Sequence, residues 1–249
     1  MKPVMKEQNI IFGRNPVLEA LKSGRAIEKI LLSGSDGSAA RIAAIARERG
    51  IRTMQADKRT LDRLAGGGAH QGVCAFTAQY EYKELADVFA RAEASGEEPF
   101  LIILDGIEDP HNLGAIMRTA ECAGAHGVII PKHSACGLTD TVAKTSAGAI
   151  EYMPCVRVTN LTRTIEELKK QGFWIAACDM GGQEYYQADL RGKLAVVIGS
   201  EGFGVSRLVR EACDFTVSMP MKGKITSLNA SNAAAVIMYE VRRQRDEQR

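Results

Sequence analysis

An apolar strand followed by a cluster of glycines constrains the fold of this chain more than any other feature. Residues 194–198 read L-A-V-V-I, a continuous apolar run typical of strands that are buried on both faces. Gly199, Gly202 and Gly204 follow, and glycine lets a backbone turn sharply or approach a ligand because it has no Cβ. The pattern predicts a buried strand that ends in a tight loop.

A second strand end of the same kind follows. Residues 215–219 form another apolar run that stops at Pro220, and residues 222–224 form a basic turn. Ser227 and Asn229 then precede an Ala-rich helix, predicted from residue 231 to about residue 245, which their side chains are suited to cap. Two strand ends, each followed by a polar loop and a helix, indicate a ligand crevice in an open α/β sheet.

The glycine loop alone does not identify the ligand. Its spacing, G-x-x-G-x-G, differs from the dinucleotide fingerprint, and the lysine and hydroxyl pair of a phosphate-binding loop is missing. Glu201 in the middle of the loop would repel a pyrophosphate. A nucleotide-dependent dehydrogenase is therefore set aside, since it also needs an acidic residue about twenty positions further on.

The rest of the second half predicts an α/β domain with a mostly parallel sheet and helices on both faces. Strands are predicted at 101–104, 127–130, 153–156 and 174–177, and helices at 112–123, 139–147 and 161–170. General rules of chain topology favour an unknotted sheet of this kind.

The first part of the chain predicts a smaller, basic α/β unit. Helices are expected at 16–22, 37–49 and 60–64, and strands at 27–32, 52–55 and 73–79. Residues 1–76 carry 13 Lys and Arg against 7 Asp and Glu, whereas the remainder carries 19 against 23. A basic front on an acidic body is the footprint of an RNA-binding module. Alternatively, four arginines of this region only keep one face of a helix solvated and have no role in RNA binding: Arg41, Arg47, Arg49 and Arg52.

An acidic amphipathic helix followed by chain breakers separates the two parts and is interpreted as a connector. The predicted organisation is therefore an N-terminal domain at 1–78, a linker at 79–99 and a C-terminal domain at 100–249.

Composition narrows the class of protein. Of the 249 residues, 45% are hydrophobic and 25% are charged, which is typical of a soluble globular protein. No apolar run is long enough to cross a membrane, and the N-terminus lacks a signal core. The six cysteines are scattered, with no C-x-x-C pair, which argues against a zinc site or a disulfide framework. We expect a cytoplasmic protein without a metal.

Three ordered motifs make the interpretation specific. Residues 112–119 read N-L-G-A-I-M-R-T, residues 199–204 read G-S-E-G-F-G, and residues 227–231 read S-L-N-A-S. Together they resemble the SpoU (TrmH-type) RNA ribose 2′-O-methyltransferases over roughly residues 100–245. The N-terminal G-R-N-P-V-L-E-A-L and the lead-in D-G-I-E-D-P-H-N-L-G are similar to the bacterial branch that methylates a guanosine of 23S rRNA.

The resemblance implies a SPOUT domain with a trefoil knot, in which loops 199–206 and 220–229 form the pocket for S-adenosyl-L-methionine. It also implies a homodimer, and a ribosomal-protein-like N-terminal domain that holds the RNA. RNA contacts are expected at Arg14, Asn15, Lys58, Arg59, His70 and Gln71, with a loop histidine without a partner as the alternative for His70.

The family motifs map the cofactor contacts to two sets of residues. The main chain of Gly199, Met219 and Leu228 is expected to hold the adenosine, with Ile198 and Pro220 shaping the walls. Ordinary core packing is the alternative for Met219 and Leu228.

Methylation of a ribose 2′-oxygen needs donor and acceptor in near-attack geometry and help for the hydroxyl to lose its proton. Arg118 lies off the apolar stripe of its predicted helix, so its guanidinium is available to clamp an RNA phosphate and stabilise the developing alkoxide. An ion pair with Glu121 is the alternative. Arginine is a poor general base because it is not deprotonated in proteins.

Four further residues complete the predicted catalytic set: Asn112, Glu201, Ser227 and Asn229. Asn112 is expected to cap its helix and reach the site, and Glu201 to pair with Arg118 or accept a donor from the substrate. Ser227 and Asn229 are expected to hold Arg118, the ribose or the methionine moiety, with capping alone as the alternative.

The predicted function is S-adenosylmethionine-dependent 2′-O-methylation of a guanosine in 23S rRNA. Two alternatives stay open: a tRNA ribose 2′-O-methyltransferase, and a non-catalytic RNA-binding ribosome assembly factor.

Overall fold

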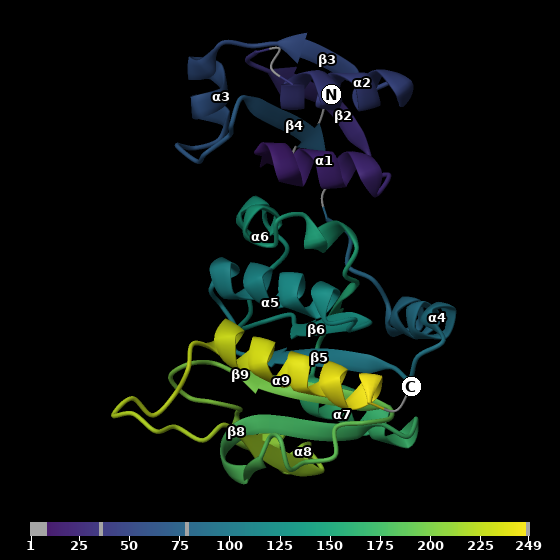
Figure 1. The fold of residues 1–249 in the computed structure, drawn as a ribbon, viewed down its shortest axis with the longest axis vertical. Coiled ribbons are helices and arrows are strands. Elements are labelled where there is room, and N and C mark those ends of the chain that lie inside the picture. The colour runs from purple at the N-terminus through teal and green to yellow at the C-terminus, as the bar shows by residue number, and fades with distance from the viewer. Residues whose placement is uncertain (1–8, 35–36, 78–79, 248–249) are drawn as a thin grey trace, which may run out of the picture. The chain divides into compact units, whose positions relative to one another are not determined.

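The computed structural model describes residues 9–34, 37–77 and 80–247, which form two compact units. The first unit contains the chain up to residue 81 together with residues 138–152. The second contains residues 82–137 and the chain from residue 153 onward. Each unit has its own sheet (Figure 1). Among the described residues, no helix is long and apolar enough to span a membrane.

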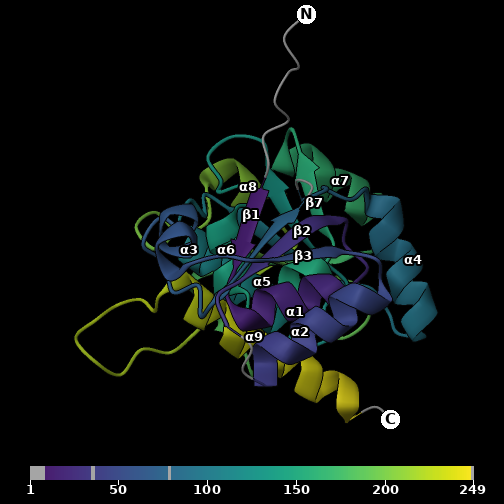
Figure 2. The same cartoon turned by 90° about the horizontal axis from the view of Figure 1, so that it is seen from above.

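The first unit is built on a four-stranded sheet in the order β1-β4-β2-β3. Strand β4 pairs antiparallel with both of its neighbours, whereas β2 and β3 are parallel. Helices α1 and α2 pack against each other, as Figure 2 shows. The elements are β1 (Asn9–Phe12), α1 (Arg14–Lys22), β2 (Ile27–Leu32), α2 (Gly37–Glu48), β3 (Arg52–Gln55), α3 (Lys58–Leu64), β4 (Val73–Thr77), α6 (Asp140–Thr145) and the 3₁₀ helix η1 (Ala149–Glu151).

Alternation along the strands gives this sheet two buried faces. Leu31, Leu61 and Cys74 belong to the cluster under α3, a helix that begins where the Asp57 side chain accepts the Thr60 amide. Ile30 points the other way from Leu31, because successive side chains of a strand face opposite sides, and it is also fully buried. Apolar residues therefore cover both faces of the central strands.

Residues 138–152 complete the first unit, although they lie within the range that the sequence assigns to the C-terminal domain. A buried ion pair joins Arg25 Nη1 to Glu151 Oε1 at 2.8 Å, with exposed side-chain fractions of 8% and 7%. The guanidinium carbon of Arg25 also lies 3.4 Å from the centroid of the Tyr80 ring. This segment is therefore tied to the N-terminal sheet by buried contacts.

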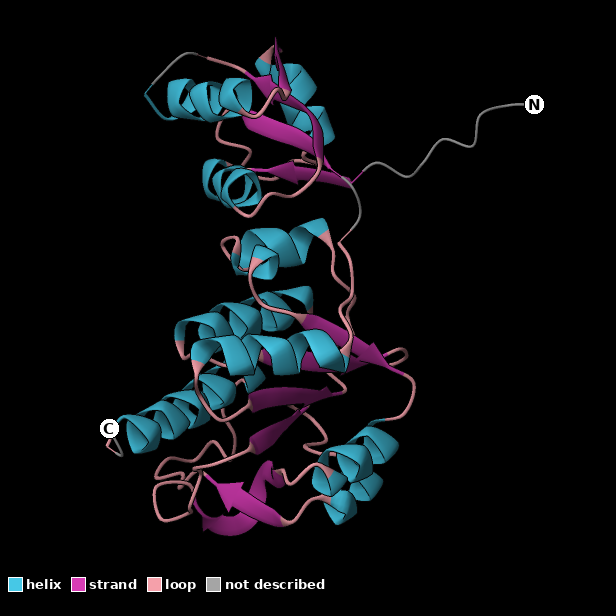
Figure 3. Cartoon of the chain, turned by 90° about the vertical axis from the view of Figure 1, so that its right-hand side faces the viewer, coloured by secondary structure: helices cyan, strands magenta, loops and turns pink. Residues whose placement is uncertain are grey.

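The second unit is built on six parallel strands in the order β10-β8-β9-β5-β6-β7. Figure 3 shows helices on both faces of this sheet, so the predicted parallel sheet between two helical layers is confirmed. The elements are α4 (Leu85–Ser95), β5 (Phe100–Asp105), α5 (Pro110–Cys122), β6 (Gly127–Pro131), β7 (Cys155–Val158), α7 (Leu161–Lys170), β8 (Trp174–Glu184), β9 (Leu194–Gly199), α8 (Arg207–Ala212), β10 (Phe215–Ser218) and α9 (Ala230–Asp246).

Side-chain alternation in the central strands sends one set of residues to each helical layer. Leu101 and Ile103 of β5 pack in a cluster with side chains of α4, α7 and α8. Helices α5 and α9 contact each other and lie side by side in Figure 1. The predicted connector helix α4 is part of this packing, since its Val88 is fully buried in the cluster.

The structure adds four features that the sequence did not indicate: strand β1, the 3₁₀ helix η1, helix α8, and the extension of β8 to Glu184. Strand β8 is interrupted where it pairs with β10, between Ala177 and Gln183. The intervening residues bulge out of the ladder beside the glycine loop. The trefoil knot implied by the resemblance stays a prediction.

Candidate active site

A pocket of about 280 Å³ lies at the carboxyl ends of β9 and β10 and beside the middle of β8, at the edge where open α/β sheets bind ligands. The loop after β9 and the segment between β10 and α9 supply most of its walls. The second segment is the yellow excursion beside α9 in Figure 1. The lining residues are Cys178, Asp179, Met180, Ile198, Gly199, Ser200, Glu201, Gly202, Phe203, Gly204, Met219, Met221, Thr226, Ser227, Leu228, Ala230 and Ala233.

The glycine loop closes on itself like a small hairpin. Ser200 and Gly204 exchange two backbone hydrogen bonds, of 3.1 and 2.9 Å. A Cβ on Gly199 would collide with the backbone of Gly204 and Val205, which explains the first glycine of the motif. Gly204 has φ +66°, and a Cβ there would lie 3.0 Å from an Asp179 carboxylate oxygen. Close backbone packing therefore requires the first glycine, and positive φ beside the Asp179 side chain favours the third.

The three sequence motifs meet at the carboxylate of Glu201. Its Oε1 accepts hydrogen bonds from Asn112 Nδ2 at 3.0 Å, from the backbone N–H of Ala230 at 3.3 Å, and from Asn229 Nδ2. Asn229 Nδ2 also donates to Asn112 Oδ1 at 2.9 Å. The carboxylate thus lies at the N-terminus of α9, where the helix dipole favours negative charge. Oε2 of Glu201 makes no hydrogen bond with the described part of the chain.

Asn229 also has the capping role that its residue type predicts. It is the N-cap of α9, and its Oδ1 accepts the backbone N–H groups of Ser231 and Asn232. Ser227 lines the pocket instead of capping the helix. The capping prediction for Asn112 is wrong: helix α5 begins two residues earlier at Pro110, and Asp109 is its N-cap.

Arg118 lies apart from this cluster. Its side chain is exposed on α5 and makes no hydrogen bond or ion pair with the residues that the structure describes. The expected pairing with Glu201 and the alternative pairing with Glu121 are therefore both absent among those residues. Arg118 is left available for an RNA phosphate.

The pocket suits S-adenosylmethionine. Ile198, Met219 and Leu228 give it apolar walls for a base, whereas the carboxylate of Glu201 borders it with negative charge suited to a cationic group. Its volume is close to the lower end of the range for small-molecule sites, roughly 300 Å³. Four of the five predicted cofactor residues line it; Pro220 does not, although both of its neighbours do.

Asp179 and Cys178 are pocket residues that sequence analysis did not single out. The only sequence signal was an acid directly after an apolar strand. Burial and, to a smaller extent, the adjacent Asp179 together raise the pKa of the Cys178 thiol to about 11, so the thiol stays protonated at neutral pH. No group of three potential metal ligands occurs among the described residues.

The six predicted RNA-contact residues of the first unit form three groups: the exposed residues Lys58, Arg59 and Asn15, the hydrogen-bonded pair Arg14 and Gln71, and His70. Lys58 and Arg59 are exposed at the start of α3, and Asn15 is exposed on α1. The backbone N–H and Nε of Arg14 donate to Gln71, at Oε1 and at the carbonyl oxygen, both at 3.1 Å. These five residues keep their expected role as a proposal.

The prediction for His70 needs correction. Its side chain is buried, its Nε2 lies 2.9 Å from Asp62 Oδ1, and its Nδ1 accepts the Gly72 amide at 2.9 Å. Both ring nitrogens are occupied, so His70 shapes the loop instead of presenting a donor to RNA. The alternative of a histidine without a partner is also wrong.

Taken together, a parallel α/β sheet with a nucleoside-sized pocket at its carboxyl edge and a polar cluster at the pocket mouth defines a cofactor-dependent α/β enzyme. Residues 99–239 match the SpoU rRNA Methylase family, and residues 10–83 match the RNA 2′-O ribose methyltransferase substrate-binding domain. The chain belongs to the SpoU family and is an S-adenosylmethionine-dependent RNA 2′-O-methyltransferase. The alternative of a non-catalytic assembly factor is therefore not retained.

Individual relatives agree with this assignment. A Bacillus subtilis protein assigned by name to the TrmH family of tRNA/rRNA methyltransferases, YacO, is 49% identical over 97% of this chain and 98% of its own. The SpoU methyltransferase AviRb from Streptomyces viridochromogenes, solved with AdoMet, has a TM-score of 0.81 at 26% identity, covering 96% of this chain and 91% of that one. The A. aeolicus TrmH/SpoU tRNA modifying enzyme has a TM-score of 0.56 at 25% identity and covers 65% of this chain and 85% of that one.

Proposed function

We propose that this protein methylates the ribose 2′-oxygen of a guanosine in 23S rRNA, acting in the cytoplasm as a homodimer. The observation that carries the catalytic part is the hydrogen-bonded cluster of Glu201, Asn112 and Asn229 at the pocket. It brings one residue from each of the three motifs together at the mouth of a pocket that fits the cofactor.

S-adenosylmethionine supplies the methyl group when it is bound. The main chain at Gly199, Met219 and Leu228 would hold its adenosine, with Ile198 contributing to the wall. Asn112 and Asn229 fix the Glu201 carboxylate through Oε1, which leaves Oε2 to accept a hydrogen bond from the substrate. Ser227, at the pocket wall, is placed to contact the ribose or the methionine moiety.

Arg118 is assigned to the RNA. An exposed guanidinium without a protein partner among the described residues is suited to bind a phosphate with two parallel hydrogen bonds and to stabilise a 2′-alkoxide. Lys58 and Arg59 add phosphate contacts from the first unit, where Arg14, Gln71 and Asn15 are also expected to bind RNA.

Ribosomal RNA is preferred to tRNA because of the first unit. The tRNA modifying enzyme from A. aeolicus covers only 65% of this chain, whereas AviRb covers 96%. The match of residues 10–83 to a substrate-binding domain supports this choice.

Transfer of labelled methyl groups to 23S rRNA and to bulk tRNA tests the proposal, with wild type and Arg118→Ala compared at equal folded concentration. We expect ribose label in 23S rRNA that is lost in the variant. Label in tRNA alone would overturn the substrate and keep the reaction. Light scattering of the same sample tests the dimer, since a monomeric mass would contradict it.

A further inference from the structure

Two aspartates that belong to none of the three motifs hold the glycine loop from opposite sides. Strand β9 lies between β8 and β5 in the sheet, and the glycine loop follows β9. Asp179 of β8 accepts the backbone N–H of Val205 through Oδ2 at 3.3 Å. Asp105, the last residue of β5, accepts the backbone N–H of Ser206 through Oδ2 at 2.8 Å. Successive amides of one loop are therefore bound by carboxylates from both neighbouring strands.

Further contacts fix each part of this arrangement. Oδ1 of Asp179 accepts the backbone N–H of Met180 at 2.7 Å, and its Oδ2 lies 3.7 Å from Arg210 Nη1 on α8. The carboxylate sits against the bare Cα of Gly204, where a Cβ would lie only 3.0 Å away. The side chain of Asp179 is only 13% exposed, so these bonds form where water competes weakly.

Alternation along β8 places Asp179 within reach of the loop. Ile175 and Ala177 pack in the same cluster as Val205, and Asp179, two residues beyond Ala177, continues that face of the strand. Regular pairing of β8 with β10 stops after Ala177 and resumes at Gln183. Asp179 and Met180 lie in this bulge, and both line the pocket.

We propose that Asp179 and Asp105 are positioning residues for methyl transfer: together they hold the glycine loop as one wall of the cofactor pocket. The two residues act through the backbone of Val205 and Ser206, so neither is called catalytic. This inference rests on the proposed function for the identity of the ligand, but the clamp itself is a property of the protein alone.

Hydrogen exchange of the cofactor-free protein tests the clamp first. In Asp179→Ala and in Asp105→Ala we expect the amides of both Val205 and Ser206 to exchange faster, because each carboxylate restrains the same short loop. Asp189→Ala, which breaks an exposed pair with Arg191 elsewhere in the second unit, is the matched control and should leave both amides unchanged. Unchanged exchange in the two clamp variants would overturn the proposal.

Cofactor binding tests the consequence. For either clamp variant we expect the Kd and the KM for S-adenosylmethionine to rise about tenfold, the effect of one lost hydrogen bond to a charged group, with kcat within about twofold of wild type. Asp179→Asn keeps an acceptor oxygen for the Val205 amide and should restore most of the affinity. The double alanine variant should lose less than the product of the two single factors, since both residues hold one loop.

The outcomes separate the two proposals. If wild type fails to bind S-adenosylmethionine, the proposed function fails while the exchange result still reports on the clamp. If exchange rises but the Kd stays unchanged, the loop is loosened without affecting the pocket, and the positioning role is overturned. If Asp179→Asn binds as poorly as Asp179→Ala, the negative charge and not the hydrogen bond matters, which also overturns it.

Discussion

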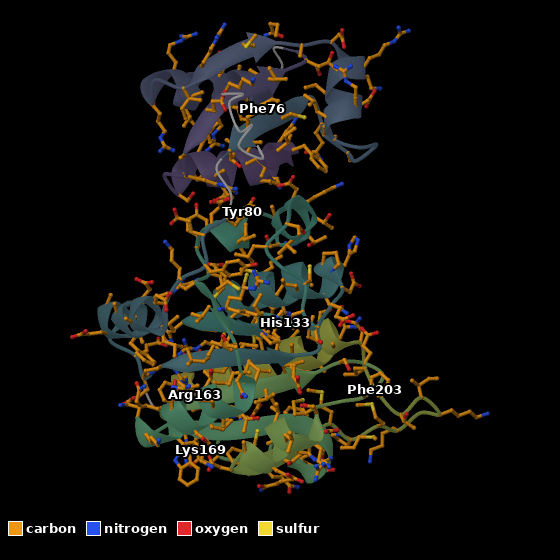
Figure 4. All side chains as sticks on the ribbon, turned by 180° about the vertical axis from the view of Figure 1, so that it is seen from behind. Phe76, Tyr80, His133, Arg163, Lys169 and Phe203 are labelled. Carbon is orange, nitrogen blue, oxygen red and sulfur yellow. The ribbon has the colours of Figure 1, made fainter. Side chains whose placement is uncertain are left out.

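The carboxylate of Glu201 is held by neutral donors: two side-chain amides and one backbone N–H, all on the same oxygen. A partner such as Arg118 would have cancelled its charge, whereas amides orient a carboxylate and leave that charge in place. The pocket mouth therefore keeps a fixed negative group with one oxygen directed to other partners. Phe203, two residues further along the loop, is 95% exposed and labelled in Figure 4.

The dual role of Asn229 gives a prediction at the scale of one residue. Asn229→Ala removes the cap of α9 and a donor to Glu201, so we expect a loss of about 1 kcal/mol in the free energy of unfolding and a loss of most methyl transfer. Asn160→Ala is the matched control, because Asn160 caps α7 through the Arg163 amide and does not line the pocket.

Urea unfolding and methyl transfer of both variants check this prediction. Equal losses of stability with activity lost only in Asn229→Ala are the expected pattern. Full activity in Asn229→Ala would contradict the role assigned to its side-chain amide.

The motif residues were predictable from sequence, but their partners were not. The resemblance of the three motifs to a known family identified Glu201, Asn112 and Asn229, yet Glu201 was expected to pair with Arg118 or to accept a donor from the substrate, not to bind the two asparagines. Arg118 lies six positions after Asn112 on α5, and at 100° per residue the two side chains point about 120° apart. The Asp109-Pro110 pair was a readable start signal for that helix, since Pro favours the first helical position.

Among the elements, most were predicted, including the four-residue strand β3 at its exact bounds, whereas β1 and α8 were missed. The bounds of α7 agree with the prediction residue for residue, because its Asn160 cap and apolar stripe are both clear. Helix α8 has only 6 residues and β1 only 4, too few to show a period. Strand β8 was predicted to end at Ala177, whereas the strand continues to Glu184 through a bulge that contains Gly181 and Gly182.

His126 connects elements and gives a prediction about pH. It is 2% exposed; its Nδ1 accepts the amide of Phe100 at the start of β5, so Nε2 carries the proton toward Ser95 Oγ at the end of α4. Burial, and next the charge of Arg245, lower the pKa of His126 to about 4 from its ordinary 6.5. Between these values the unfolded chain binds a proton that the folded state does not.

The free energy of unfolding should therefore be intact above pH 6.5 and fall as the pH is lowered toward 4, by about 3 kcal/mol in total from this residue. Urea unfolding across that range measures the loss. His126→Asn keeps an acceptor for the Phe100 amide but does not titrate, so its stability should change less over the same range. An identical pH dependence in the variant would refute this cause.

On the scale of the whole molecule, the two compact units do not correspond to two consecutive stretches of the sequence. The rhythm of strands and helices after residue 100 predicts a single C-terminal domain, yet residues 138–152 pack with the N-terminal sheet. The spacing of apolar residues indicates that a helix such as α6 has an apolar face, and Val142 and Ala143 are indeed buried. The spacing does not indicate which sheet covers that face. The tertiary contacts of residues 138–152, and not their own sequence pattern, therefore place this segment in the first unit.

The Arg25–Glu151 pair tests that attachment. Arg25→Ala leaves the Glu151 carboxylate buried without its cation, so we expect the free energy of unfolding to fall by about 3 kcal/mol. Arg163→Ala is the matched control, because the Arg163–Glu167 pair is exposed, with exposed side-chain fractions of 79% and 45%, and its loss should cost within about 0.5 kcal/mol. Arg163 is labelled in Figure 4.

Chemical denaturation of the full chain measures both variants. Similar small losses in the two proteins would show that the buried pair contributes no more than a surface pair, and would contradict the attachment described for residues 138–152.

The placement of residues 138–152 has a consequence for how such enzymes are recombined. A module that folds from one continuous stretch is exchanged between proteins by joining the chain at a single point. Here the RNA-binding unit is completed by a second stretch that lies between β6 and β7 of the catalytic sheet. A chimera that takes its substrate-binding unit from another family member must therefore import both stretches, or replace Glu151 and its apolar neighbours so that they match the new host.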